Sequence, residues 1–136
     1  MAPQLTDLCT LIQVFDMMVS IEFYCGKLGF AIAQQSPVIE EPYRHFNWAL
    51  LQQGEVRLML NTAYEAPERP HAIGPERRAA HADTILYFGC PDVDDAYRQL
   101  TAAGIDMRPP KTAPYGMKQI SFKDPDGYDI CLQWPA

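Results

Sequence analysis

The chain carries the same pattern of elements twice, and this internal duplication limits its possible folds more than any other feature. Each half has an aspartate suited to cap a helix, an apolar helical face, a glycine after the helix, and a second glycine in a later hairpin turn. The matching residues keep a nearly constant offset: 76 residues from Asp16 to Asp92, 75 from Gly29 to Gly104, and 73 from Gly54 to Gly127. Such self-similarity indicates a duplicated supersecondary unit.

In the first half, the residue pattern predicts four strands and one helix. Asp16 is placed to accept hydrogen bonds from the first free backbone N–H groups of the helix, and Gly29 ends it as a C′ glycine. The apolar residues between these two recur at helical spacing. The strands are predicted over residues 9–14, 30–34, 45–51 and 55–61, with the last two joined by a turn at 52–55.

The second half repeats this order. Asp92 begins the helix and Gly104 ends it, and Pro109 and Pro110 end the strand that follows because proline cannot donate to a sheet. The strands are predicted over residues 84–90, 105–108, 117–123 and 128–134, with a turn at 124–127. The fold class is therefore α+β, made of two tandem βαβββ modules, each a four-stranded sheet with a helix on one face.

These elements divide the chain into three parts within a single domain, 1–136. Module one covers residues 8–62, a connector covers 63–83, and module two covers 84–135. The connector is rich in proline and charge and is interpreted as a solvated link. The alternative is a lid over a pocket mouth.

Composition excludes several classes of function. Hydrophobic residues make up 48% of the chain and charged residues 21%, as in soluble globular proteins. A net charge of -6 argues against binding to nucleic acid or to an anionic membrane surface. No apolar run reaches the roughly 20 residues of a membrane span, and the N-terminus has no secretion signal. The four scattered cysteines are then expected to be free thiols in a cytoplasmic protein.

Short motifs in both halves resemble the vicinal oxygen chelate superfamily. The first-half motifs are Gln13-Val14-Phe15-Asp16, Ile21-Glu22-Phe23-Tyr24 and Leu28-Gly29-Phe30; the second-half motifs are Pro91-Asp92-Val93-Asp94 with Gly104, and Asp124-Pro125-Asp126-Gly127-Tyr128. That superfamily includes glyoxalase I, extradiol dioxygenases, fosfomycin-modifying enzymes and the metal-free bleomycin resistance proteins. The resemblance implies a glyoxalase/bleomycin resistance fold, in which the two modules form a curved mixed-sheet half-barrel around a pocket.

The resemblance also identifies where a metal would be held. Metal-dependent members take one ligand from the first and last strand of each module, and these positions correspond here to Cys9, Leu58, Ile85 and Cys131. Leucine and isoleucine cannot bind a metal, and two thiolates do not complete a zinc site. We therefore expect no metal and no other cofactor. A divalent metal held by His81 with a cysteine is the alternative.

The histidines and cysteines do not identify a catalytic group. Besides His81, the histidines are His45 and His71, and all three are interpreted as surface residues. Cys9 and Cys131 are interpreted as packing residues, because a thiol nucleophile needs a neighbouring base or positive charge. No catalytic residue is identified.

Strand alternation predicts which side chains line the pocket, because every second residue points to the same face. The pocket is expected to have aromatic and aliphatic walls with a few polar groups, which suits a flat, partly apolar ligand. The candidate ligand-binding residues are Gln13, Trp48, Tyr87, Tyr115, Met117, Gln119 and Asp129.

The leading functional hypothesis is metal-independent binding and sequestration of a small aromatic or drug-like molecule, as in the bleomycin resistance proteins. One alternative is a lyase, isomerase or dioxygenase of the same superfamily with an unrecognised metal site. Another is a regulator or subunit with a vestigial pocket. The expected assembly is a homodimer, because apolar sheet faces need covering and two-fold dimers are the commonest oligomers.

Overall fold

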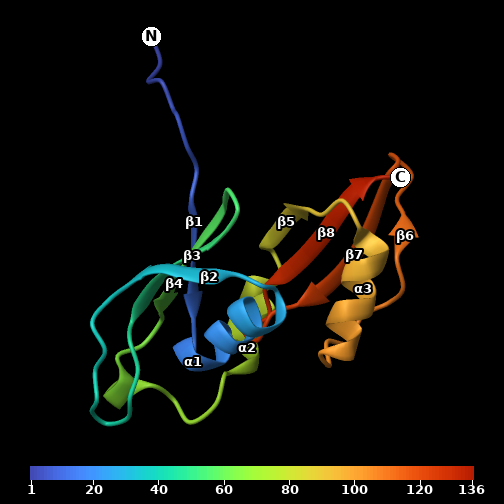
Figure 1. Cartoon of the computed structure of the whole chain (residues 1–136). Coiled ribbons are helices and arrows are strands. Elements are labelled where there is room, and N and C mark those ends of the chain that lie inside the picture. Colours follow the sequence, from blue (N-terminus) through green and yellow to red (C-terminus); the bar gives the residue numbers. More distant parts are fainter. The chain divides into compact units, whose positions relative to one another are not determined.

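The computed structural model describes the whole chain, residues 1–136, as two compact units. The first unit spans Met1–Arg69 and the second spans Pro70–Ala136. Each unit contains one four-stranded mixed sheet with helices beside it (Figure 1). No helix in the chain is both long and apolar enough to cross a membrane.

The sheet of the first unit has the strand order β1-β4-β3-β2. β1 runs parallel to β4, while the β4–β3 and β3–β2 pairs are antiparallel. The strands are β1 (Thr10–Val14), β2 (Ala31–Gln35), β3 (Trp48–Gln53) and β4 (Val56–Thr62). The helical elements are α1 (Met17–Ile21), the π-helix η1 (Glu22–Lys27) that continues it, and the short 3₁₀ helix η2 (Ala66–Glu68).

The second unit repeats the topology, with the strand order β5-β8-β7-β6. Again the first and last strands are parallel and the other pairs antiparallel. The strands are β5 (Ile85–Gly89), β6 (Lys111–Thr112), β7 (Met117–Lys123) and β8 (Asp129–Pro135); the helices are α2 (Pro75–His81) and α3 (Val93–Ala102). The prediction of two βαβββ modules is confirmed.

Side chains and glycines start and end the helices where the sequence predicts. Oδ1 of Asp16 accepts hydrogen bonds from the backbone N–H groups of Met18 and Val19, and Asp92 caps α3 in the same manner through Asp95. Gly29 and Gly104 have φ angles of 83° and 92°, a region that glycine enters without steric cost.

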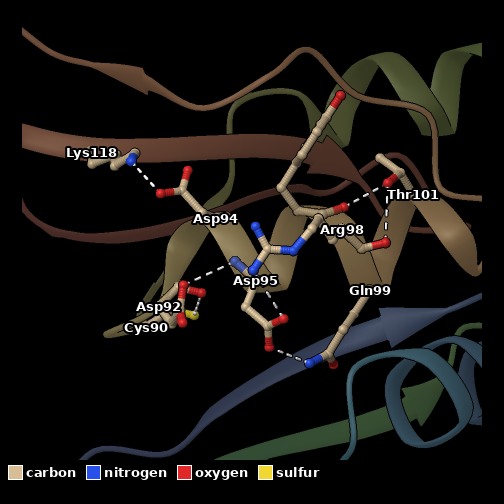
Figure 2. Close-up of polar contacts among 9 residues, drawn as sticks. Cys90, Asp92, Asp94, Asp95, Arg98, Gln99, Thr101 and Lys118 are labelled. Carbon is tan, nitrogen blue, oxygen red and sulfur yellow. Dashed lines mark hydrogen bonds and ion pairs between the residues drawn. The ribbon is translucent and has the colours of Figure 1, made fainter.

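Side-chain contacts also link α3 to its own sheet and connect successive turns within the helix. The carboxylate of Asp94 pairs with Nζ of Lys118 on β7, and Asp95 accepts from Nε2 of Gln99 one turn further along the helix (Figure 2). The helix lies across one face of β7 and β8, with Val93 and Leu100 buried (Figure 1). The opposite face of this sheet carries no helix of its own module.

The core of each unit lies on the helix side of its sheet. In the first unit, Ile12 and Val14 of β1 are buried while Leu11 and Gln13 between them are exposed. The same alternation buries Ile120 and Phe122 of β7. Alternating strand residues therefore separate a packed helix face from a second face in each module, which we call the free face.

The second strand of module two differs from the prediction. Residues 105–108 form no strand; β6 is the two-residue segment Lys111–Thr112, after the prolines rather than before them. Ile105 is buried instead of paired. Pro109 and Pro110 lack N–H donors, so the chain can join β7 as an edge strand only beyond them.

The connector is structured in its second half. α2 begins at Pro75, and its Arg77 forms an ion pair with Asp126 in the β7–β8 turn. The ring of His81 stacks on Tyr128 with centroids 3.9 Å apart, and its Nδ1 lies 2.8 Å from the backbone oxygen of Asp126. The residues from Pro70 onward belong to the compact second unit.

Candidate functional site

The free face of module two collects most of the predicted ligand-binding residues. Cross-strand partners in the sheet are Gly89, Gln133, Gln119 and Lys111, which form one row across all four strands. A second row contains Tyr87, Cys131 and Ser121, and a third contains Ile85, Asp129 and Lys123. Because partners directly opposite point to the same face, the predicted residues Tyr87, Gln119 and Asp129 share this surface, and alternation along β7 adds Met117.

Hydrogen bonds fix the polar side chains of the first row. Nε2 of Gln119 donates to Oη of Tyr115 over 2.7 Å and to Oε1 of Gln133 over 2.8 Å. These two bonds use both amide protons of Gln119 and leave its amide oxygen as an acceptor. In the third row Lys123 pairs with Asp129 at 2.7 Å. The free face thus presents oriented polar groups beside aromatic rings.

The aromatic residues of this surface are exposed. Tyr87 is 55% exposed and Tyr115 is 68% exposed, far more than expected for tyrosines that fill a core. The structure therefore places both of these predicted wall residues on an accessible surface of the second unit.

Cys131 lies in the middle of the same surface but is only 3% exposed. Burial raises the pKa of its thiol above the usual range, and a hydrogen bond with Ser121 opposes this in part. A raised pKa keeps the group as a neutral thiol at neutral pH, whereas nucleophiles and metal ligands need the thiolate. The geometry favours the packing role predicted for Cys131.

A groove of about 550 Å³ adjoins this surface along the β6 edge. Its volume is within the range typical of small-molecule sites. Gln119 belongs both to the groove and to the first row of the free face, so the two features are continuous. The lining residues are Met107, Arg108, Pro109, Lys111, Ala113, Pro114, Gln119, Ile120 and Ser121.

Module one has a free face of its own. Here Gln13, Asn61 and Trp48 form one row across β1, β4 and β3, and Leu11 and Met59 lie in the next row. The two predicted residues Gln13 and Trp48 are therefore on one face, two strands apart. Asn61 between them was missed, because its facing depends on the pairing register of β4 and not on its own sequence.

The same register corrects one predicted ligand position. Leu58 pairs with Thr10 and Leu51 and is buried on the helix face together with Leu60. The free-face residue of β4 at this level is Met59. Leu58, which the resemblance places at a metal position, therefore points away from the free face, because a shift of one residue moves a side chain to the opposite face.

The residues at the family's metal positions do not fit a metal ion. Cys131 is a buried neutral thiol, Ile85 is aliphatic, and neither Leu58 nor its free-face neighbour Met59 offers a nitrogen or oxygen donor. Nowhere in the chain do three or more His, Cys, Asp or Glu side chains gather as a potential metal site. The alternative of a site rebuilt around His81 gains no support, since its ring stacks on Tyr128.

One histidine departs from its predicted surface position. His45 is 6% exposed, and its Nδ1 lies 2.6 Å from the backbone oxygen of Tyr43. Its neighbourhood is a small cavity, large enough for about one water, in which the Arg69 guanidinium stands over the Phe15 and Tyr43 rings. Arg69 also pairs with the helix cap Asp16 at 3.2 Å. This cluster fastens the end of the first unit to the start of α1.

Comparisons with known proteins agree with this architecture. The family model described as "Glyoxalase/Bleomycin resistance protein/Dioxygenase superfamily" matches residues 7–132. No curated protein matches the sequence.

Several solved structures share the fold over nearly the full length of both chains. TioX from Micromonospora sp. ML1 has a TM-score of 0.73 and 20% identity, covering 96% of this chain and 99% of TioX. TnmS3, an antibiotic binding protein from Streptomyces sp. CB03234, has a TM-score of 0.69 and 23% identity, covering 99% and 100%. A bleomycin-binding protein complexed with bleomycin has a TM-score of 0.69 and 18% identity, covering 97% and 100%.

Proposed function

The chain belongs to the Glyoxalase/Bleomycin resistance protein/Dioxygenase superfamily, and we propose that within it this protein binds a small aromatic or drug-like molecule without using a metal ion. The observation that carries the proposal is the free face of module two, where exposed tyrosines stand beside hydrogen-bonded amides. Sites for flat organic ligands combine an apolar or aromatic wall with a few fixed polar groups.

The similar structures support the same class of ligand. Two of them are an antibiotic binding protein and a bleomycin-binding protein. Their identity to this chain is low, so they support a ligand class and not a particular drug. The donor set at the family's metal positions supports binding without a metal, because those residues supply too few suitable ligands.

Ligand affinity is expected to reside in the aromatic wall and not in the thiols. Apolar area removed from water contributes roughly 25 cal/mol per Å², and ring contacts add about 0.5–1.5 kcal/mol per pair. A thiol contributes mainly its volume, because it is a weak donor and acceptor. Within module two, Tyr87 should therefore matter more than Cys131.

The test is to titrate the protein with metal-free bleomycin and, separately, with 2-naphthamide, a neutral flat probe. Binding is measured by calorimetry and by ¹H–¹⁵N NMR. At about 0.3 kcal/mol for each of about 13 non-hydrogen atoms, 2-naphthamide should bind with a dissociation constant near 1 mM or below. Tyr87→Ala should weaken binding to module two about tenfold or more, equivalent to about 1.4 kcal/mol.

Two matched variants test whether the aromatic ring itself makes the contact. Tyr87→Phe keeps the ring and should retain most of the affinity, and Cys131→Ser should change it much less than Tyr87→Ala does. Loss of binding in Cys9→Ser or Cys131→Ser, with silent aromatic variants, would show that the thiols are the functional groups. Failure of both probes to shift any resonance of the free faces would refute the proposed function itself.

A further inference from the structure

The groove at the β6 edge carries positive charge in an otherwise acidic chain. Seven of the eleven lysines and arginines form ion pairs. The four that form none are Lys27, Arg78, Arg108 and Lys111. Two of these four, Arg108 and Lys111, line the same groove, whose lining contains no aspartate or glutamate. A net charge of -6 makes such a carboxylate-free pocket with two unpaired cations unusual for this chain.

The sheet register directs Lys111 to the ligand-binding surface. Lys111 pairs with Gln119 across the β6–β7 ladder, so both side chains point to the free face of module two. Gln119 in turn holds the Tyr115 hydroxyl at 2.7 Å. Lys111 is thus the β6 end of the row that contains Gln119, and Gln119 links this row to the exposed Tyr115.

The rest of the groove is largely apolar. Met107, Pro109, Ala113 and Pro114 supply most of its wall. A purely anionic ligand such as free phosphate would leave these apolar groups unused, and a purely apolar one would leave two cations facing a hydrocarbon surface. The lining matches a molecule with an apolar body and a terminal anionic group.

We propose that the ligand of module two is an aromatic or otherwise flat organic anion whose negative group is held by Arg108 and Lys111. This inference rests on the proposed function and adds the charge of the ligand to it. The apolar body lies along the free face beside Tyr115 and Tyr87, and the anionic group points toward the β6 edge. Arg108 presents a planar guanidinium suited to an oxyanion, and Lys111 presents a compact point charge.

The experiment compares three probes of matched shape by ¹H–¹⁵N NMR titration and calorimetry: 2-naphthoate, 2-naphthamide and 2-naphthylmethylammonium. Wild-type protein in low salt should bind the anion about tenfold or more tightly than the neutral amide, because ionised hydrogen-bond partners make stronger bonds than neutral ones. The cation should bind most weakly. The amide signals of Arg108 and Lys111 should move with 2-naphthoate.

Groove variants and added salt then test whether the preference for the anionic probe arises in the groove. Arg108→Gln with Lys111→Gln should bring 2-naphthoate down to the affinity of 2-naphthamide and leave 2-naphthamide binding unchanged. Arg78→Gln, on exposed α2 and equally unpaired, changes the net charge by one without touching the groove and should have little effect. Raising NaCl to about 0.5 M should reduce the anion preference, because the screening length falls well below its value of about 10 Å at 0.1 M.

The failures of the two proposals are distinguishable. If 2-naphthamide binds as tightly as 2-naphthoate, or if Arg78→Gln weakens 2-naphthoate as much as the groove variants do, the anion site is refuted while aromatic binding stands. If none of the three probes binds, the anion site falls together with the proposed function.

Discussion

Replacing Arg77 by methionine should lower the free energy of unfolding by about 3 kcal/mol. Asp126 is 1% exposed, and its Oδ1 lies 3.4 Å from Nη2 of Arg77, whose side chain is 18% exposed. Breaking a buried ion pair by removing one partner costs about 3–5 kcal/mol, because the other charge stays buried and loses its counter-ion. The lower end applies here, since 3.4 Å is longer than the roughly 2.7–2.9 Å of a strong charge-assisted hydrogen bond.

Replacing Arg77 and replacing Asp126 should lower the free energy of unfolding by different amounts. Asp126→Asn should destabilise less than Arg77→Met, because asparagine keeps an acceptor oxygen and water can reach part of the Arg77 side chain. The double variant should be less destabilised than the sum of the single ones, since no buried charge is left behind. This coupling measures the attachment of α2 to the β7–β8 turn.

Urea denaturation followed by circular dichroism measures these differences, with Arg78→Met as the matched control. Arg78 is the next residue on α2, is exposed and has no ion pair, so its replacement should change stability by no more than about 0.5 kcal/mol. If Arg77→Met is as mild as Arg78→Met, then α2 is not held to the turn by this contact. The contacts of His81 with Tyr128 and Asp126 would then be the ones that hold α2 to the turn.

Three further predictions concern chemistry and assembly. Burial raises the pKa of the Cys131 thiol, so alkylation of this thiol by iodoacetamide should be slow at pH 7 and should accelerate as the pH rises toward and past 9. An alkylation rate that is already at its plateau near neutral pH would contradict this. Protein purified without chelators should contain no stoichiometric Zn, Fe, Mn or Ni by elemental analysis, and one tightly bound ion per chain would favour the enzymatic alternative. Sedimentation equilibrium at about 10–50 µM should give a homodimer, because exposed apolar residues such as Leu11 and Ile85 leave sheet surface to be covered. A monomer would count against it.

Local sequence alone determines the repeat and the direction of its side chains. Asp16 and Asp92 cap the helices, and Gly29 and Gly104 end them with positive φ angles, as predicted from short motifs. Strand alternation places Gln119, Asp129 and Tyr87 on one face of module two, as predicted. These features depend on bonded geometry and on contacts between residues a few positions apart, which one sequence contains in full.

The sequence alone does not predict which residues of distant segments contact one another; only the tertiary structure shows this. The register of β1 against β4 puts Met59 and not Leu58 on the free face, and the prolines move β6 to Lys111, which brings a cation beside Gln119. The contact of Arg77 with Asp126, 49 positions away, attaches α2, which lies in the predicted connector, to the second unit. Pairing energies between remote strands and helices fix these positions, and no local pattern in the sequence encodes which residue of each segment meets the other.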